Sequence, residues 1–305
     1  MNYVSILVGK IEVMFAIIIL GCFLMKKNFI TNGFVKDASK LLASVISPVI
    51  CVNSFITEYT ADKAKALALS SLLTIVILLF SAIITKIFLG KKSLSLERFA
   101  AIFPNCGFIG IPLVSATFGQ EAVFYIAPTI AICTMVCWTY GVYVLTGDKK
   151  SISLKGIITN PCVIAVLIGL IIFFCKIPVA SFFTDCFSSL NGIMLPISSM
   201  IVGCNLAELN IKDIKANKSV VISALFRLLV IPVIACVLFK FVDESYYLLK
   251  YGILVSMSTP AAANSTIFAV TFGKDSQKGA LAICLTSLLC VLTIPLVLTL
   301  SSLIW

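Results

Sequence analysis

The sequence predicts an all-α membrane protein in which ten transmembrane helices form two inverted repeats of five. The first reason is composition: 60% of the 305 residues are hydrophobic and only 12% are charged, which is more apolar than a water-soluble domain. The second is that ten apolar stretches approach the length of about 20 residues needed to cross a bilayer. The third is a repeated spacing, since Pro48 and Pro112 are 64 residues apart, as are Pro196 and Pro260.

The ten stretches follow one another through short loops, which leaves no segment for a soluble catalytic domain. The first ends in Lys26 and Lys27 without a small-residue cleavage site, so we interpret it as a permanent helix rather than a signal sequence. The second and seventh each contain a proline, an asparagine and several serines, and the fourth and ninth are interrupted by prolines among polar residues. The predicted spans are 6–25, 40–57, 66–89, 99–118, 123–145, 157–175, 182–206, 220–242, 248–272 and 280–304.

The charged loops predict the orientation of these spans. Loops that follow odd-numbered spans carry 16 lysine and arginine residues, whereas loops that follow even-numbered spans carry five. Because cytoplasmic loops hold the excess of lysine and arginine, we expect loop 149–155 in the cytoplasm and Gln120 and Glu121 outside. The expected location is the cell membrane, crossed several times, with both termini extracytoplasmic.

The net charge of +10 follows mainly from this orientation. The alternative is a surface that attracts anions or lipid headgroups. The basic residues are spread along the loops rather than gathered with aromatic residues, which argues against a nucleic-acid partner. The expected surroundings of the chain are the lipid bilayer.

The chain divides into two halves that we expect to be inverted repeats. The charged linker at 147–151 separates residues 1–150, the first predicted repeat, from residues 151–305, the second. Five spans in each half turn the second half upside down relative to the first. Secondary transporters often follow this plan, with interrupted helices at corresponding positions. The fourth and ninth spans are such symmetry mates, and both are interrupted.

These interruptions predict a binding site. Proline removes a backbone donor and glycine adds flexibility, and the freed backbone groups are tolerated in a bilayer only where they are buried in protein or face a wet cavity. Helix N-termini that meet there carry partial positive charge and free N–H groups, which suit an anion. The alternative is a pair of packing kinks. The predicted substrate-binding residues are Pro104, Asn105, Cys106, Gly107, Ser258, Thr259, Pro260 and Asn264.

The same two segments resemble signatures of a known family. The run at 104–113, PNCGFIGIPL, resembles the fourth-helix signature of the auxin efflux carrier family in its bacterial members. The run at 258–264, STPAAAN, with FAVTFG at 268–273, resembles the ninth-helix signature. The resemblance covers essentially the whole chain, because further residues also fit it: Asn160, Pro161, Pro196, Arg227, Pro232 and Pro295.

The resemblance implies a fold shared with bile acid/sodium symporters. Helices 1, 2, 6 and 7 would form a scaffold, through which a homodimer is a further expectation, and helices 3–5 and 8–10 a moving transport domain. The implied function is that of a secondary transporter that moves a small organic anion, such as auxin or a dicarboxylate, by alternating access. Asn105 and Asn264 would face the substrate. The match departs from the family at Ser258 and Thr259, where many members have a second proline or a bulkier residue, so the substrate stays open.

Four other polar residues are secondary candidates, each with a structural alternative. Arg227 either attracts a substrate carboxylate or serves as a coupling charge, or it bonds carbonyls at the helix crossing. Glu12 either titrates with proton transport or reaches outward and pairs with a neighbouring lysine. Asn53 and Asn205 either line the scaffold side of the site or bond between helices.

The sequence also limits coupling and chemistry. No acidic residue lies in the second to fifth or the eighth to tenth spans, and the chain has no histidine. We therefore expect potential-driven uniport or proton coupling through Glu12 or Glu208. The alternative is coupling to sodium at a site built from carbonyls and hydroxyls. The 12 cysteines form no CxxC pair, so neither metal nor cofactor is expected. No catalytic pair is evident, which argues against an enzyme and leaves a channel or a ligand-binding membrane sensor as the alternative to a carrier.

Overall fold

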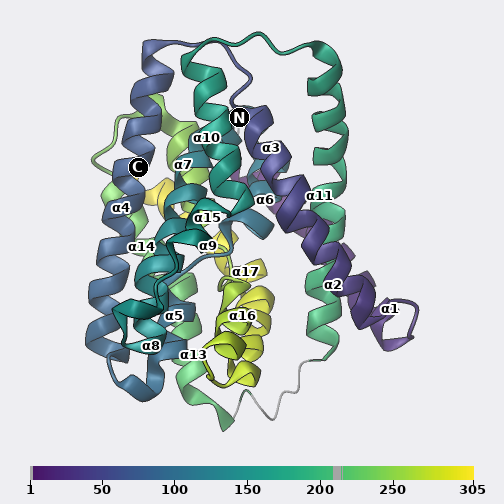
Figure 1. The fold of residues 1–305 in the computed structure, drawn as a ribbon, viewed down its shortest axis with the longest axis vertical. Helices are drawn as coiled ribbons and strands as arrows, with labels where there is room; N and C mark the ends of the chain where they lie inside the picture. Colours follow the sequence, from purple (N-terminus) through teal and green to yellow (C-terminus); the bar gives the residue numbers. More distant parts are fainter. Residues whose placement is uncertain (1–2, 209–213, 215) are drawn as a thin grey trace.

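The computed structural model describes residues 3–208, 214 and 216–305, and these form a bundle of helices without a β-strand (Figure 1). In chain order the α-helices are α1 (Tyr3–Lys26), α2 (Asn32–Leu41), α3 (Ser47–Ser54), α4 (Ala61–Leu89), α5 (Ser95–Ile102), α6 (Ile111–Phe118), α7 (Gln120–Val136), α8 (Val142–Thr146), α9 (Leu154–Ile158), α10 (Pro161–Phe174), α11 (Ser181–Ala207), α13 (Lys218–Leu225), α14 (Ile231–Phe239), α15 (Tyr247–Met257), α16 (Asn264–Thr271) and α17 (Ser276–Ile304).

Six continuous helical segments of the described chain are long and apolar enough to cross a membrane, as expected for an all-α membrane protein. They are Val8–Lys26, Ala61–Leu89, Gln120–Thr146, Ser181–Ala207, Lys218–Phe239 and Ser276–Ile304. A seventh candidate is the pair Lys149–Ile158 and Pro161–Phe174, which is bent by 51°. The fourth and ninth predicted spans fall on shorter pieces. The helical run 32–54, which covers most of the second predicted span, is not among the six segments, so the number ten stays a prediction.

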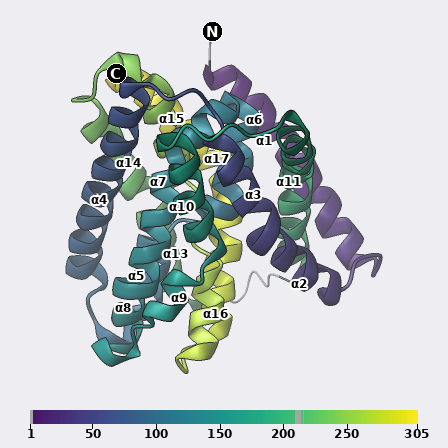
Figure 2. The same cartoon turned by 45° about the horizontal axis from the view of Figure 1, so that its top comes forward.

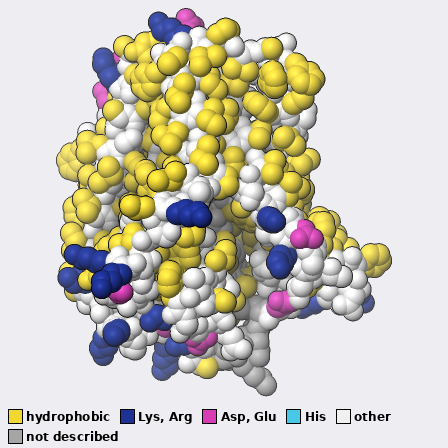
Figure 3. Space-filling model, in the orientation of Figure 1, with side chains coloured by type: hydrophobic (Ala, Val, Ile, Leu, Met, Phe, Trp, Pro, Cys, Tyr) yellow, Lys and Arg dark blue, Asp and Glu magenta, His cyan; other side chains and the backbone are white. Residues whose placement is uncertain are grey.

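Apolar side chains cover much of the outer surface, as a protein surrounded by lipid requires. On α4 the exposed side chains include Leu72, Leu79, Ile83 and Ile87, whose exposed fractions lie between 57% and 70%. Figure 3 shows hydrophobic side chains over most of one face, with basic side chains gathered toward its lower end. In Figures 1 and 2 the start of α1 and the end of α17 lie in the upper part of the molecule, away from that basic end.

Short π-helical turns occur in four of the helical segments that the structure describes. They lie at Leu42–Ile46, Cys106–Gly110, Cys137–Gly141 and Phe226–Val230. Three of them directly precede a segment whose second residue is a proline: Pro48, Pro112 and Pro232. A proline has no N–H and its ring clashes with the carbonyl one turn earlier, so the helix widens locally instead of breaking.

Two sets of helices pack closely within themselves. In the first set, α1 runs along α11, and α3 packs against both α10 and α11. Glycine allows the α1–α11 contact: a Cβ atom at Gly203 would lie 2.0 Å from the Ile18 carbonyl oxygen, so the backbones touch as small residues permit. In the second set, α7 packs against α4 and α15, and α17 against α13 and α16. The assignment of these sets to a scaffold and a transport domain stays a prediction.

Candidate functional site

The two interrupted helices meet in the middle of the bundle. Helix α5 ends at Ile102 and α15 ends at Met257, and the extended segments that follow them form an antiparallel bridge between Pro104 and Ala261. The Asn105 N–H donates to the Pro260 carbonyl at 2.8 Å, and the Ala262 N–H donates to the Phe103 carbonyl at 2.9 Å. These bonds satisfy the backbone groups that the breaks free, which is why non-helical backbone is tolerated there.

Arg227 binds the C-terminal ends of the two helices that precede the breaks, α5 and α15. Its side chain is completely buried. Its Nη1 donates to the carbonyls of Ala101 at 3.2 Å and Ile102 at 2.7 Å, and its Nη2 donates to the Met257 carbonyl. Helix C-terminal carbonyls carry partial negative charge, so the guanidinium is bound electrostatically as well as by hydrogen bonds. This geometry matches the structural alternative for Arg227.

A cavity of about 290 Å³ lies at the crossing, and its lining does not include Arg227. Five predicted site residues line it, namely Pro104, Asn105, Cys106, Gly107 and Asn264. Its other lining residues are Ala43, Ser44, Ser47, Phe103, Phe108, Ile130, Cys133, Thr134, Cys137, Asn160, Pro161, Cys162, Ala262 and Ala263. Among these described residues none is charged, so the polar groups facing a ligand would be amides, hydroxyls, thiols and helix N-termini.

The two asparagines hold different places in this cavity. Asn105 precedes a continuous helix formed by Cys106–Gly110 and α6. Asn264 opens α16, and its Nδ2 donates to the Cys137 sulfur at 3.6 Å. Asn105 therefore precedes the N-terminus of one helix, and Asn264 lies at the N-terminus of another, where the Ser265 and Thr266 N–H groups already donate to the Ala262 and Ala263 carbonyls.

Ser258, Thr259 and Pro260 lie outside the lining of the cavity. The Ser258 hydroxyl donates back to the Leu254 carbonyl and the Thr259 hydroxyl to the Ser256 carbonyl, each at 2.7 Å. Both side chains are buried. Their polar groups therefore complete the end of α15, and their direct contact with a substrate stays an untested prediction.

Sequence reasoning missed several residues that line the cavity. Ser47 is 1% exposed, and its hydroxyl has no hydrogen-bond partner among the described residues. Thr134, Cys133 and Cys137 come from the middle of α7 and the turn after it, where no motif marks them. In the sequence, only the resemblance to the auxin efflux carrier family draws attention to Asn160. In the structure its Oδ1 caps α10 by accepting from the Cys162 N–H at 3.0 Å.

The remaining secondary candidates lie elsewhere. Asn53 lines a separate cavity of about 270 Å³ with Lys63, Gln120 and Glu121. Asn205 lines a polar cavity of about 600 Å³ with Glu208, Asp275 and Lys278. Glu12 is exposed on the surface of α1. Within the part of the chain that the structure describes, no cluster of three cysteine, aspartate or glutamate side chains is arranged to hold a metal ion.

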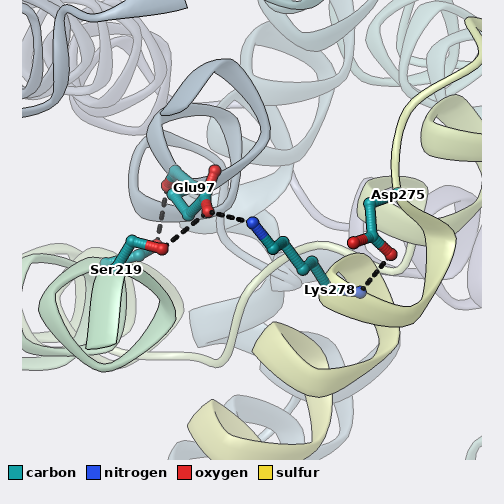
Figure 4. Close-up of polar contacts among 5 residues, drawn as sticks. Glu97, Ser219, Asp275 and Lys278 are labelled. Carbon is teal, nitrogen blue, oxygen red and sulfur yellow. Dashed lines mark hydrogen bonds and ion pairs between the residues drawn. The ribbon is translucent and has the colours of Figure 1, made fainter. Parts of the chain in front are cut away.

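The structure adds a buried acidic residue just outside the predicted fourth span. Helix α5 begins at Ser95, four residues before the predicted fourth span, so it includes Glu97, which is 2% exposed. Figure 4 shows Glu97 between two neighbouring helices: its Oε1 accepts from the Ser219 hydroxyl at 2.8 Å and lies 3.6 Å from the Lys278 Nζ. Asp275 in turn caps α17 by accepting from the Lys278 N–H at 3.1 Å. The cluster ties α5, α13 and α17 together.

Replacing Glu97 by glutamine is expected to lower the free energy of unfolding by about 1–3 kcal/mol, because Ser219 and Lys278 lose a charged acceptor. Lys278 keeps one-third of its side chain exposed, which limits the loss relative to a fully buried pair. Thermal unfolding in detergent measures it. The matched control, Lys65→Gln, breaks the exposed pair with Asp62 and should change little. Equal effects of both changes would contradict the role given to Glu97.

A helical membrane protein with a cavity at two interrupted, crossing helices has an architecture typical of secondary transporters. The sequence matches the family described as membrane transport protein twice, over residues 6–153 and over residues 148–298. The chain therefore belongs to this family, which is of the auxin efflux carrier type, and the resemblance seen in the motifs is confirmed. It is a multi-pass membrane transporter of a family that is not one of enzymes. No curated protein matches the sequence.

Proposed function

We propose that the protein is a secondary carrier that moves a small organic anion, in particular a carboxylate, by alternating access at the crossing. The observation that carries this proposal is the cavity of about 290 Å³ at the crossing. Two helix N-termini and the side chains of Asn105 and Asn264 lie in its lining. Such groups bind an anion without a fixed ion pair, so release stays easy.

A second observation favours alternating access over a static binding site. The cavity is lined by segments of α3, α7 and α10 with the crossing. The predicted symmetry mates of these three helices are α11, α17 and α1. These line a space of only about 10 Å³, together with Ile109 and Pro112 of the crossing. One set of three helices thus leaves a cavity where its set of symmetry mates is closed, which is the asymmetry expected of a carrier held in one of two states.

Helix packing supports the same interpretation. Helix α6, which follows the first break, packs against α1 and α11, whereas α16, which follows the second break, has its main contacts with α17 and α5. The cavity beside α16 reaches the surface, because Ser44 and Ala263 in its lining are exposed. Closure of the cavity would need α16 to approach α10, as α6 now approaches α1.

The open side is the cytoplasmic side in our proposal. The cavity reaches Asn160 at the start of α10, which follows the basic loop 149–155 closely in the chain. Positively charged loops favour the cytoplasmic face of a membrane. The protein then lies in the cell membrane with both termini extracytoplasmic, and the structure corresponds to an inward-facing state.

Reconstitution into proteoliposomes tests the proposal. A carrier should take up a radiolabelled carboxylate saturably and should exchange it for unlabelled carboxylate trapped inside. Uptake without saturation or exchange would indicate a channel. Binding without any uptake would indicate a sensor.

Polar side chains join the two sets of helices at the end of the bundle where α6 ends and α7 begins. The Asn191 Nδ2 of α11 donates to the Ser115 hydroxyl of α6 at 2.8 Å and lies 3.3 Å from the Gln120 Oε1 of α7. The Gln120 Nε2 donates to the Ile50 carbonyl of α3 at 3.1 Å. The bonds of Gln120 join α7 of the second set to α3 and α11 of the first, so they must break if the sets move apart on this side.

Cross-linking this contact is expected to stop transport. The pair Asn191→Cys and Ser115→Cys should form a disulfide, because the two native side chains are in hydrogen-bond contact, and oxidation should abolish exchange in proteoliposomes. Reduction should restore it, and either single change should remain active after oxidation. Full exchange by the oxidised, cross-linked protein would show that these helices do not separate there.

A further inference from the structure

A second polar cavity lies where α3 ends and where α4 and α7 begin. Its volume is about 270 Å³, which is just below the ~300–1,000 Å³ typical of sites for drug-sized ligands, so it suits a smaller molecule. Among the described residues it shares no lining residue with the cavity at the crossing. Its lining includes Asn53 of α3, Lys63 of α4, and Gln120 and Glu121 of α7.

The side-chain amide of Asn53 points to a ligand in this cavity. Asn53 is 9% exposed and lines the cavity. Its amide forms no hydrogen bond with the residues that the structure describes, and neither of its two polar atoms is completely enclosed. An amide offers two donors and an acceptor, and buried polar groups are rarely left without partners. The Asn53 amide is therefore placed to bind a polar group inside the cavity.

Two opposite charges face the same cavity without neutralising each other. The Lys63 Nζ donates to the Thr57 hydroxyl at 2.6 Å and to the Glu58 carbonyl at 3.4 Å, and both acceptors are neutral. The Glu121 Oε1 accepts from the Tyr125 hydroxyl at 3.4 Å. The two ion pairs found among the described residues include neither Lys63 nor Glu121. A cation and a carboxylate held apart across a small cavity suit a ligand that carries both charges.

The second half of the chain repeats this set of groups. The sequence Thr-Phe-Gly occurs at 117–119 and at 271–273, and each copy is followed two residues later by an acidic residue, Glu121 or Asp275. The cavity of about 600 Å³ is lined by Asp275 with Asn205, Gln277 and Lys278. An asparagine, a glutamine, a lysine and an acidic residue thus recur in both cavities, which favours a built site over an incidental gap. Lys278 already pairs with Glu97, so the inference concerns only the cavity at Asn53.

We propose that the cavity at Asn53 binds a small α-amino acid in its zwitterionic form. The Lys63 ammonium and the Asn53 amide bind its carboxylate, and the Glu121 carboxylate binds its ammonium group, so no charge is left without a partner. Since α3 belongs to the first set of helices and α4 and α7 to the second, a bound amino acid connects the two sets. This effect on transport rests on the proposed function, whereas the binding itself does not.

Thermal stabilisation of the purified protein at pH 7 tests the binding. The probes are glycine, L-alanine and L-valine, each compared with its amide derivative, which keeps the ammonium group and has no carboxylate. We expect at least one amino acid to raise the unfolding temperature and to bind about tenfold or more tightly than its amide, a difference that corresponds to about 1.4 kcal/mol. The amide should bind the Lys63→Met variant at least as tightly as the wild-type protein, because it has no carboxylate to lose a partner.

Substitutions on both charged sides locate the site. Lys63→Met and Glu121→Gln should each weaken binding of the amino acid about tenfold or more, and Asn53→Ala should weaken it as well. Glu121 is exposed, so its replacement by glutamine should leave the fold intact. Lys65→Met removes a nearby exposed cation and, as the matched control, should leave the affinity unchanged. Asn105→Ala alters the cavity at the crossing and should leave amino-acid binding unchanged.

Transport measurements test the connection between the two sets of helices. In proteoliposomes, the same amino acid added on both sides of the membrane should slow carboxylate exchange by the wild-type protein. It should not slow exchange by the Asn53→Ala variant. Full exchange by wild-type protein that is saturated with the amino acid would overturn the connection.

The outcomes separate this inference from the proposed function. The inference would be overturned if none of the three amino acids stabilised the protein, if the amides bound as tightly as the amino acids, or if both Lys63→Met and Glu121→Gln kept the wild-type affinity. Loss of amino-acid binding in Asn105→Ala would place the ligand at the crossing and overturn it too. Amino-acid binding at the predicted residues, without carboxylate exchange by the protein free of amino acid, would contradict the proposed function and leave this site in place.

Discussion

Replacing Arg227 by methionine is expected to destabilise the protein strongly. Three buried carbonyls, at Ala101, Ile102 and Met257, would lose their donor. Each unmet buried acceptor costs about 1–3 kcal/mol, and removal of a buried charge offsets part of this. We therefore expect the free energy of unfolding to fall by about 3 kcal/mol or more, measured by thermal unfolding and by the monodisperse fraction in detergent.

Conservative and remote changes provide the controls for Arg227. Arg227→Lys keeps the charge but lacks the planar fork, so it should satisfy fewer carbonyls and lose roughly half as much stability. Lys155→Met removes an exposed cation and should shift stability by no more than about 0.5 kcal/mol. If the Arg227→Met protein unfolds at the wild-type temperature, the carbonyls have other partners and the guanidinium does not hold the crossing together.

The crossing could be predicted from sequence because its chemistry is local. Prolines at corresponding places of two halves signal interrupted helices without any knowledge of packing, and the segments beginning at Pro104 and Ser258 do contain the breaks. The five residues that reach the cavity belong to those motifs. The sequence did not show which side chains of a motif face the cavity. Ser258 and Thr259 belong to the same motif, but their hydroxyls donate back to carbonyls of α15.

Tertiary contacts decided the features that the sequence did not reveal. Glu97 lies just before an apolar stretch, which favours a surface position, and only the approach of α13 and α17 buries it. Thr134 and Cys137 belong to a uniformly apolar stretch. They line a cavity only because α10 forms its opposite wall. Helix ends and facing surfaces are set by neighbours distant in the chain, which is why single-sequence patterns miss them.

Replacing Asn105 or Asn264 by alanine is expected to weaken binding of a carboxylate by roughly 5- to 150-fold. The physical reason is that each amide offers donors and an acceptor beside a helix N-terminus. A ligand group left without its partner in a buried site costs about 1–3 kcal/mol. Direct binding of a carboxylate that stabilises the wild-type protein, measured on each purified and folded variant, gives the change in affinity.

The two asparagines also allow the binding site to be distinguished from a pair of packing kinks. Asn205→Ala is the matched control, because Asn205 lines a different cavity and its removal should leave affinity unchanged. If the breaks only bend helices, neither Asn105→Ala nor Asn264→Ala should alter affinity more than this control does. If only Asn105 matters, α16 does not contribute to the site, since Asn264 is already engaged with Cys137. Weaker binding in both variants, with folding retained, is the result that an anion held between two opposed helix N-termini requires.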